Sequence, residues 1–474
     1  MALNNILTIL PEVKAPIQKL SFKPRLVWTL IILFAFFILS IIPLYGLGVN
    51  ELARLEQLSV ILGASFGSIL SLGIGPIVTS SIVLQLLTGS GLLNIDQTNH
   101  DGRVFYQGLQ KWLTLFFIVF EACVYVFMGG LQPNVALQGT SSYFTFQLIL
   151  IGQLILGGLL VVLMDEISTK WGLGSGVSLF IAAGVAQEIV IRTFSPLNTV
   201  GQIAFGSGQP PVGAILVFLM SLVGGDPQGA LLALAAIAAT VVVFGLCVYA
   251  QAMKVEIPLS FGKVRGYGIR WPLNFLYTSN IPVILIAALM ANVELFARLL
   301  EKWGLPLLGT FAGNSPASGL VLWIANPQLV VKILTGSLSM TSWWSNDVTH
   351  ALAYALILII GSLVFSIFWV QTAGMSASSQ AKNILASGLQ IQGFRRDQRV
   401  LESVLNRYIF PLTVMGGITI GALAAVADLL GALSRGTGIL LAVMIIYRLY
   451  QDIAKHYMMD MNPAMRKMMG GGDE

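Results

Sequence analysis

Residues 72–87 read LGIGPIVTSSIVLQLL, and this stretch decides how the rest of the chain is interpreted. Gly73, Gly75 and Pro76 disfavour an uninterrupted helix, because glycine adds backbone entropy and proline lacks an N–H group. The residues after Pro76 nevertheless follow a helical pattern. A single helix over 56–87 would be about 48 Å long, well beyond a hydrocarbon core of about 30 Å. We therefore expect two half-length helices separated by a break.

A broken helix at membrane depth indicates a cavity. Non-helical backbone is tolerated at that depth only where protein or a water-filled cavity satisfies its polar groups. Transporters use such breaks to line their pathways. The stretch 72–87 therefore predicts a transport function.

The composition is that of an integral membrane protein. Of the 474 residues, 56% are hydrophobic and only 10% are charged, against about 25% charged residues in soluble proteins. The apolar runs approach the length of a spanning helix and lack the alternation of barrel strands. We therefore expect an all-α membrane protein.

The hydropathy pattern predicts ten transmembrane helices, of which the second is the broken one. They cover 26–45, 57–88, 110–130, 145–164, 175–193, 229–250, 273–291, 350–371, 405–426 and 437–454. The apolar piece 212–223 is too short to cross, so we interpret it as an interfacial or re-entrant helix. Residues 1–24 have apolar positions at helical spacing, interrupted by two prolines, and are interpreted as an amphipathic segment on the membrane surface.

The basic residues predict the orientation of the chain. All but six of the 26 Lys and Arg residues fall on the side of the termini, which argues for cytoplasmic termini and a cytoplasmic tail at 455–474. Five spans precede the external connection 195–228 and five follow it. The two halves, 25–194 and 229–454, must then have opposite orientations. No residue-level repeat relates them, so the inverted symmetry is a topological inference.

Catalytic motifs are absent from the sequence. It has no G-x-x-x-x-G-K-[ST] loop, no H-E-x-x-H and no G-x-S-x-G. The three histidines are scattered singly, and the two cysteines fall inside predicted spans, so we expect no metal site and no disulfide framework. We predict that the protein is not an enzyme and has no cofactor.

Ionisable residues inside the spans need an explanation, because each costs several kcal/mol unless it is paired or hydrated. Glu188 lies late in the fifth span and Asp428 near the end of the ninth, and only Glu121 is deep. Two interpretations of Glu121 stay open. It is either a protonated or hydrogen-bonded packing residue, or a functional polar contact at a moving helix interface.

Two basic loops on the side of the termini also have two interpretations. The loop 254–272 has a strand-like and turn-like composition with four basic residues, and the loop 390–400 adds three more. Both could serve orientation alone. Their length and shared charge instead favour an anionic partner, such as a phosphate backbone.

Six strings, in this order, closely resemble the SecY/Sec61 family of protein-conducting channels, and its archaeal members in particular. They are GIGPIVT at 73–79, LGSGVSLFIAAG at 173–184, VEIPL at 255–259, SNIPVI at 279–284, PLTVM at 411–415 and GTGILL at 436–441. The resemblance covers essentially the whole chain. It implies a clamshell of two inverted five-helix halves around a central pore, hinged between spans five and six.

The resemblance also implies a pore constriction and a plug. The constriction would be a ring formed by Ile74, Val78, Val177, Ile181, Ile284 and Leu441. All six are aliphatic, and a dry aliphatic collar blocks ions by dewetting while offering a passing chain no fixed hydrogen bonds. The plug would be a half-helix over about 57–70, including Gln57, Ile61, Gly63, Ser65, Gly67 and Leu70.

A lateral gate and a docking surface are implied in the same way. The gate would open toward lipid between spans two and three and spans seven and eight, with Thr79, Glu121 and Asn292 as its polar cluster. The two basic loops would bind the ribosome, including ribosomal RNA, through Lys263, Arg265, Arg270, Arg395 and Arg396. Further implied partners are small single-span subunits of the SecE/gamma and beta type, the nascent polypeptide with its signal sequence, and lipid. Whether an ATPase motor replaces the ribosome stays open.

We therefore expect a passive channel in the cell (plasma) membrane, multi-pass with both termini cytoplasmic. It would translocate unfolded polypeptides and release hydrophobic segments laterally into lipid. One alternative is a secondary transporter with its substrate site at 73–76. Another is a membrane insertase without an aqueous pore.

Overall fold

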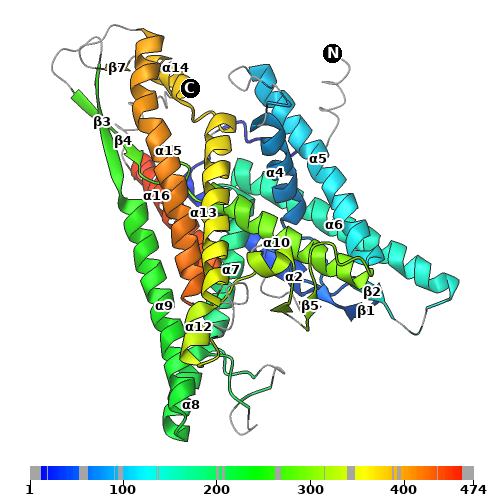
Figure 1. The fold of residues 1–474 in the computed structure, drawn as a ribbon. Coiled ribbons are helices and arrows are strands. Elements are labelled where there is room, and N and C mark those ends of the chain that lie inside the picture. The colour runs from blue at the N-terminus through cyan, green and yellow to red at the C-terminus, as the bar shows by residue number, and fades with distance from the viewer. Residues whose placement is uncertain are drawn as a thin grey trace.

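A computed structural model describes most of the chain (Figure 1). The described residues are 12–18, 20–52, 62–89, 91–93, 95, 100–134, 136, 138–198, 202–204, 209–261, 268–313, 315–338, 347–386, 389–391, 397–434 and 436–461.

Helices dominate the described structure. They are α2 (Phe22–Ile41), α4 (Gly75–Gly89), α5 (His100–Phe127), α6 (Ser141–Trp171), α7 (Gly176–Phe194), α8 (Ala214–Gly224), α9 (Pro227–Ala252), α10 (Ile281–Lys302), α11 (Leu320–Ile324), α12 (Leu329–Leu334), α13 (Asp347–Thr372), α14 (Ala377–Ala386), α15 (Gln398–Leu429) and α16 (Gly436–Met461). Within the described residues, nine helices are long and apolar enough to cross a membrane, and α4 is a shorter apolar helix. The predicted all-α membrane fold is confirmed, with α4 as the shortened second span.

Small sheets join the helices at both ends of the molecule. β3 (Lys254–Phe261) pairs with β4 (Gly268–Asn274), as the strand-like composition of this loop predicts, and also with β7 (Leu389–Ile391). We call the end that carries β4-β3-β7 the sheet end. At the other end, which we call the far end, β1 (Leu47–Asn50) pairs with β2 (Leu131–Pro133), and β5 (Phe311–Ala312) pairs with β6 (Ser315–Pro316).

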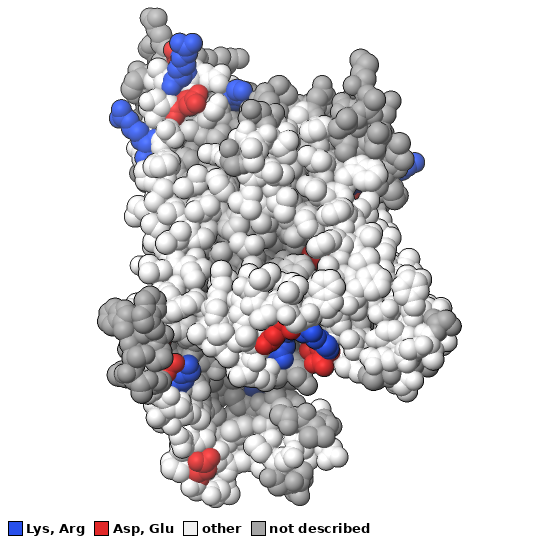
Figure 2. Space-filling view, turned by 45° about the vertical axis from the view of Figure 1, so that its right-hand side comes forward, with Lys and Arg blue, Asp and Glu red and all other residues white. Residues whose placement is uncertain are grey.

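Two separate seams join the N-terminal and C-terminal halves. α4 contacts α10 and α13 in one seam, and α7 contacts α16 in the other. The largest hydrophobic cluster lies between these helices and includes residues of both halves. In Figure 2, charged side chains gather toward the two ends, and an almost uncharged surface lies between them. A surface of this kind suits contact with lipid, where charged side chains are costly.

The predicted half-helix before the break is wrong for residues 62–70. These residues form turns, and the break continues to Ile74, where α4 is about to begin. Gly63, Gly67 and Gly73 have φ values of 51°, 96° and 54°, a left-handed conformation that does not propagate a right-handed helix. A backbone hydrogen bond of 2.8 Å from Ile74 N–H to Leu62 O closes the turn segment. Residues 57–61 of the predicted plug lie outside the described residues.

The predicted start of the seventh span, at 273, is also wrong. β4 continues to Asn274, a turn follows, and α10 begins only at Ile281 with Pro282 in its first turn. Proline fits the first turn of a helix, where its missing N–H group would have no partner within the helix. At the C-terminus, α16 continues to Met461, so the first part of the predicted tail 455–474 is helical.

The segment before α2 differs from the interpretation based on helical spacing. Residues 12–16 form no helix and lie against α6. Val13 N–H donates a 3.0 Å hydrogen bond to Glu166, and the Trp171 indole N–H donates one of 2.9 Å to the carbonyl of Lys14. In contrast, the short apolar helix predicted at 212–223 is present as α8.

Candidate pore and gate

The six residues of the predicted ring meet in one hydrophobic cluster. Five of them are buried, with exposed fractions of 0–6%: Ile74, Val78, Ile181, Ile284 and Leu441. The sixth, Val177, is partly buried and packs against the same cluster. We call these six side chains the collar. They come from four helices and from the turn before α4, so the collar forms only in the folded chain.

Local backbone features position each part of the collar. Ile74 follows the left-handed turn at Gly73, and Val78 lies one helical turn further along α4. On α7, the N–H of Val177 donates a 3.0 Å hydrogen bond to Asp165 of α6, which fixes the start of the helix. On α16, the N–H of Thr437 donates a 2.9 Å bond to Asp428, one turn before Leu441. Carboxylates at helix N-termini favour both arrangements.

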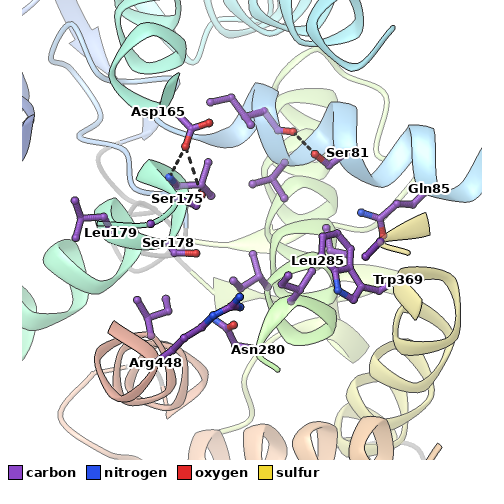
Figure 3. Close-up of a pocket in the computed structure, with 18 of the residues that line it drawn as sticks. Ser81, Gln85, Asp165, Ser175, Ser178, Leu179, Asn280, Leu285, Trp369 and Arg448 are labelled. Carbon is purple, nitrogen blue, oxygen red and sulfur yellow. Dashed lines mark hydrogen bonds between the residues drawn. The ribbon is translucent and has the colours of Figure 1, made fainter. Parts of the chain in front are cut away.

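A cavity lies on each side of the collar. The sheet-end cavity has a volume of about 460 Å³ and is lined by Val78, Val177 and Ile284 of the collar, together with polar side chains. Figure 3 shows residues of α7 and α16 on one side of this cavity and residues of α4 and α13 on the other. The far-end cavity has a volume of about 1080 Å³ and is lined by residues 63–66 and by residues of α7. Three collar residues line the sheet-end cavity, and the turn segment that lines the far-end cavity packs against Ile74.

Part of the predicted plug rests directly on the collar. A Cβ atom on Gly63 would lie 3.5 Å from the Ile74 side chain, so the turn segment packs against the ring from the far end. Leu70 is buried with an exposed fraction of 1%. Ser65 donates a 3.0 Å hydrogen bond to the carbonyl of Ser40 in α2. Hydrogen bonds of this kind and the buried side chains of Leu62, Leu70 and Leu72 hold residues 62–72 over the collar.

The three residues predicted for the lateral gate are hydrogen-bonded to one another. Asn292 Nδ2 of α10 donates to Thr79 Oγ1 of α4 over 3.0 Å, and Thr79 Oγ1 donates to Glu121 Oε1 of α5 over 3.1 Å. Glu121 is buried, with an exposed fraction of 2%, and its Oε2 has no hydrogen-bond partner among the described residues. The trio crosses the seam between the halves. Its function as a gate stays a prediction.

The structure describes little of the predicted docking residues. Arg270 lies in β4 opposite Pro258 of β3. The other four, Lys263, Arg265, Arg395 and Arg396, lie outside the described residues. The pairing of β3 with β7, in which Ser260 lies opposite Gln390, nevertheless shows that the two basic loops meet in one sheet.

Sequence reasoning missed the role of three polar contacts. Asp165 lies eleven residues before the start of α7, and its contact with this helix can be recognised only once α6 and α7 are known to fold back on each other. Asp428 and Glu188 were noticed as charges inside spans, but their partners could not be named. Asp428 accepts a 2.6 Å hydrogen bond from Tyr354 of α13, and Glu188 accepts one from Ser434.

A bundle of apolar helices with a cavity toward each end of its core is typical of a membrane transport protein. The family model described as SecY matches residues 68–450 of the chain. The protein translocase subunit SecY of Pyrococcus furiosus is 41% identical, over 97% of this chain and 97% of its own length. The chain therefore belongs to the SecY family. It is a multi-pass membrane channel and not an enzyme.

Solved structures agree in fold over almost the entire chain. The structure described as that of a protein conducting channel has a TM-score of 0.81 and 37% identity, and the match covers 98% of this chain and 99% of that one. A second chain, described as Sec61 in the canine ribosome–channel complex from the endoplasmic reticulum, has a TM-score of 0.78, 37% identity and the same coverage.

Proposed function

We propose that the collar is the constriction through which this channel conducts unfolded polypeptide. As a SecY protein, the chain translocates polypeptides across a membrane. Our assignment concerns which of its residues form the pore. The observation that supports the assignment is the meeting of six aliphatic side chains between two cavities. A ring without fixed hydrogen-bonding groups excludes water and ions, yet it does not bind a passing chain.

The collar assignment is tested by measuring ion current through the resting channel in planar bilayers. Replacement of the collar residues by glycine or serine is expected to add a leak, because a polar or widened ring stays wet. The matched control replaces exposed aliphatic residues of the outer surface, such as Leu156 and Val241, by serine. An unchanged current in the collar variants would refute the assignment of these six residues to the constriction.

A second measurement tests whether Ile74 lies on the path of the translocating chain. A photoreactive group in place of Ile74 should crosslink to a secreted soluble protein that is arrested during translocation. Absence of this crosslink would contradict the place of Ile74 in the constriction.

In this proposal, the plug segment also blocks the pore of the resting channel. Residues 57–70 are displaced toward the far end when a chain enters, and residues 62–70 are the part of this segment that lies over the collar. Gly63, Ser65 and Gly67 have small side chains. These small side chains bury little apolar area, so most of the free energy that opposes displacement of residues 62–70 comes from the buried side chains of Leu62 and Leu70.

The hydrogen-bonded trio is the proposed closure of a lateral gate. It lies in the seam where α4 contacts α10 and α13, and this seam must part for a hydrophobic segment to leave the pore toward lipid. Each hydrogen bond between transmembrane helices contributes about 0.6–2 kcal/mol. The bond from Asn292 to Thr79 crosses this seam, and a bond of this strength favours the closed gate while still allowing it to open.

The sheet end is the proposed docking surface for a ribosome. One neighbour is described as part of a ribosome–channel complex. In this chain, the basic loops around Arg270 and Arg395 meet through β3 and β7. Ribosomal RNA would attract them through its phosphates. This proposal places the sheet end and both termini in the cytoplasm of the cell, with single-span subunits of the SecE and beta type around the channel.

A further inference from the structure

The last turn of α10 makes a polar contact with the N-terminal half at the far end of the molecule. Lys302 Nζ donates a 2.8 Å hydrogen bond to the carbonyl of Gly129 and lies 3.4 Å from Glu51 Oε1. Glu51 follows β1, and Gly129 lies between α5 and β2. Figure 1 shows the end of α10 beside these two strands. We call Lys302, Gly129 and Glu51 the far-end latch.

The N-terminal half forms a suitable site for a cation without help from α10. Gly129 lies just beyond the C-terminus of α5, where the helix dipole is negative. Its φ of 83° is the left-handed conformation that commonly ends a helix, and its N–H donates a 3.2 Å bond to the carbonyl of Val126. The N–H of Glu51 donates a 3.0 Å bond to the carbonyl of Gly130. These backbone bonds hold both acceptors of the latch in place.

The hydrogen bond to Gly129 is the stronger of the two contacts of Lys302. The exposed fractions of the Lys302 and Glu51 side chains are 34% and 29%, so water screens the attraction between their charges. A charged donor at 2.8 Å from a carbonyl oxygen has the length of a charge-assisted hydrogen bond. Loss of the ammonium group should therefore matter more than loss of the Glu51 charge.

The far-end part of α10 is also buried in the core of the N-terminal half. Ala291, Leu295 and Leu299 recur every four residues, so they lie on one face of the helix. Their exposed fractions are 1–2%, and the other buried members of their hydrophobic cluster all come from residues 44–154. Apolar packing has no preferred direction, whereas a hydrogen bond requires a defined distance and angle. The latch therefore fixes one position of α10 in this core.

The two neighbouring charged side chains of α10 have partners in the C-terminal half itself. Arg298 Nη2 donates a 2.6 Å hydrogen bond to the carbonyl of Gly313, and Glu301 Oε1 accepts a 2.8 Å bond from the N–H of Phe311. Both partners lie in the hairpin of β5 and β6. Arg298 thus offers a matched control, because it carries the same charge near the same helix end but contacts its own half.

We propose that Lys302 is a positioning residue that closes the far end of the gate, and that it thereby raises the hydrophobicity a segment needs for release into lipid. The proposal rests on the proposed function of the gate. Asn292 and Lys302 are ten residues apart on α10, which is about 15 Å along the helix. The α10 helix is therefore bonded to the N-terminal half at two heights. A segment that leaves sideways must break both bonds, and burial of its apolar side chains in lipid offsets that loss.

The fraction of open gates in resting channels tests the latch directly. Lys302→Met keeps a long side chain and removes the ammonium group, so it should raise the open fraction about threefold, the factor for one interhelical hydrogen bond. Single-molecule energy transfer between labels on α4 and α13 measures this fraction. Lys302→Arg keeps the charge and should resemble the unchanged chain, as should the control Arg298→Met. An unchanged open fraction in Lys302→Met would overturn the proposal.

The hydrophobicity needed for release tests the consequence for substrates. The substrates are secretory proteins with one segment of about 20 residues, in which leucine replaces alanine stepwise. With the segment that the unchanged channel releases and translocates equally, Lys302→Met should raise the ratio of released to translocated protein about threefold. Glu51→Gln keeps the bond to Gly129 and should give a smaller rise. Equal ratios for Lys302→Met and the unchanged chain would contradict the proposal.

Failure of the latch and failure of the gate are distinguishable with Thr79→Val. If Thr79→Val raises the open fraction and Lys302→Met does not, the gate stands and the latch is wrong. If neither does, the gate assignment itself is wrong. Effects at separate sites add in free energy, so the double variant should raise the open fraction by about the product of the single effects. Elution of each variant as a single species in detergent shows that it has folded.

Discussion

Asn292 in α10 donates a 3.0 Å hydrogen bond to Thr79 in α4, and so connects the two halves of the channel at the level of the collar. Thr79 also donates to Glu121, which makes its hydroxyl the centre of the trio. Thr79→Val keeps the shape of the side chain and removes both bonds.

The gate prediction concerns the fraction of resting channels that are open. Loss of the Asn292–Thr79 bond, the bond of the trio that crosses from α10 to α4, should destabilise the closed gate by about 0.6–1 kcal/mol, which is roughly a threefold to fivefold shift toward the open state. Single-molecule energy transfer between labels on α4 and α13 measures this fraction. Thr79→Ser keeps the hydroxyl and should resemble the unchanged chain. An unchanged distance distribution in Thr79→Val would contradict the gate assignment.

The docking prediction concerns salt dependence. Arg270→Glu with Arg395→Glu should weaken cosedimentation with ribosomes and reduce the slope of log affinity against log salt by about one for each lost phosphate contact. The control, Arg270→Lys with Arg395→Lys, keeps both charges and should keep the slope. Equal sedimentation of the Glu pair and the unchanged chain would count decisively against the docking surface.

Gly73→Ala should destabilise the channel. Gly73 has a φ of 54°, and a Cβ atom there would lie 2.3 Å from the carbonyl oxygen of Leu62. The left-handed conformation alone costs about 1–2 kcal/mol for a residue with a side chain, and the clash adds to it. Thermal unfolding in detergent measures the loss. Gly152→Ala is the control, since a Cβ atom there meets nothing within 4 Å in the middle of α6. Its melting temperature should be unchanged or higher.

Asp428→Ala should lower the melting temperature more than Asp428→Asn. The alanine variant removes the acceptor used by the Tyr354 hydroxyl and by the N–H of Thr437, and each loss costs about 1–3 kcal/mol for a buried group. The asparagine variant keeps one oxygen. Equal melting temperatures for the two variants would show that the oxygen has no role in holding α16.

Tyr277 should make stability fall at high pH. Burial raises the pKa of Tyr277 from 10.0 to about 12, and its hydroxyl donates a 2.8 Å hydrogen bond to the carbonyl of Met375. Because the pKa in the folded state lies above that in the unfolded state, this contribution is fully present below pH 10 and is lost as the pH rises from about 10 to 12. Between pH 9 and pH 11 (about one unit either side of the ordinary tyrosine pKa), the melting temperature of Tyr277→Phe should therefore fall by less than that of the unchanged chain. Tyr45→Phe, at a residue with an exposed fraction of 70%, is the control. An equal drop in Tyr277→Phe and in the unchanged chain would contradict this assignment.

The break at 73–76 and the polar trio are predicted from two different kinds of information. Glycine and proline disfavour a helix wherever they occur together, so the break follows from local chemistry. Thr79, Glu121 and Asn292 lie far apart in the chain, and only the resemblance to a family with a known gate could place them together. Their hydrogen bonds in the structure agree with that placement.

The errors have a common physical origin. Hydropathy records how apolar a segment is, and the apolar residues before Ile281 are buried in a strand and a turn instead of in α10. Hydropathy likewise could not separate turns from helix at 62–70, where left-handed glycines decide the conformation. Contacts such as Ser260 with Gln390 depend on the assembled fold and leave no local pattern.

The sheet of β3, β4 and β7 belongs entirely to the C-terminal half. Its strands connect to α9 and α10 on one side and to α14 and α15 on the other, so the two basic loops share one platform, the three-stranded sheet. A large particle seated on this platform would hold only one half of the channel. The other half, which carries the plug segment and α4, would stay free to swing while the particle feeds its chain into the pore.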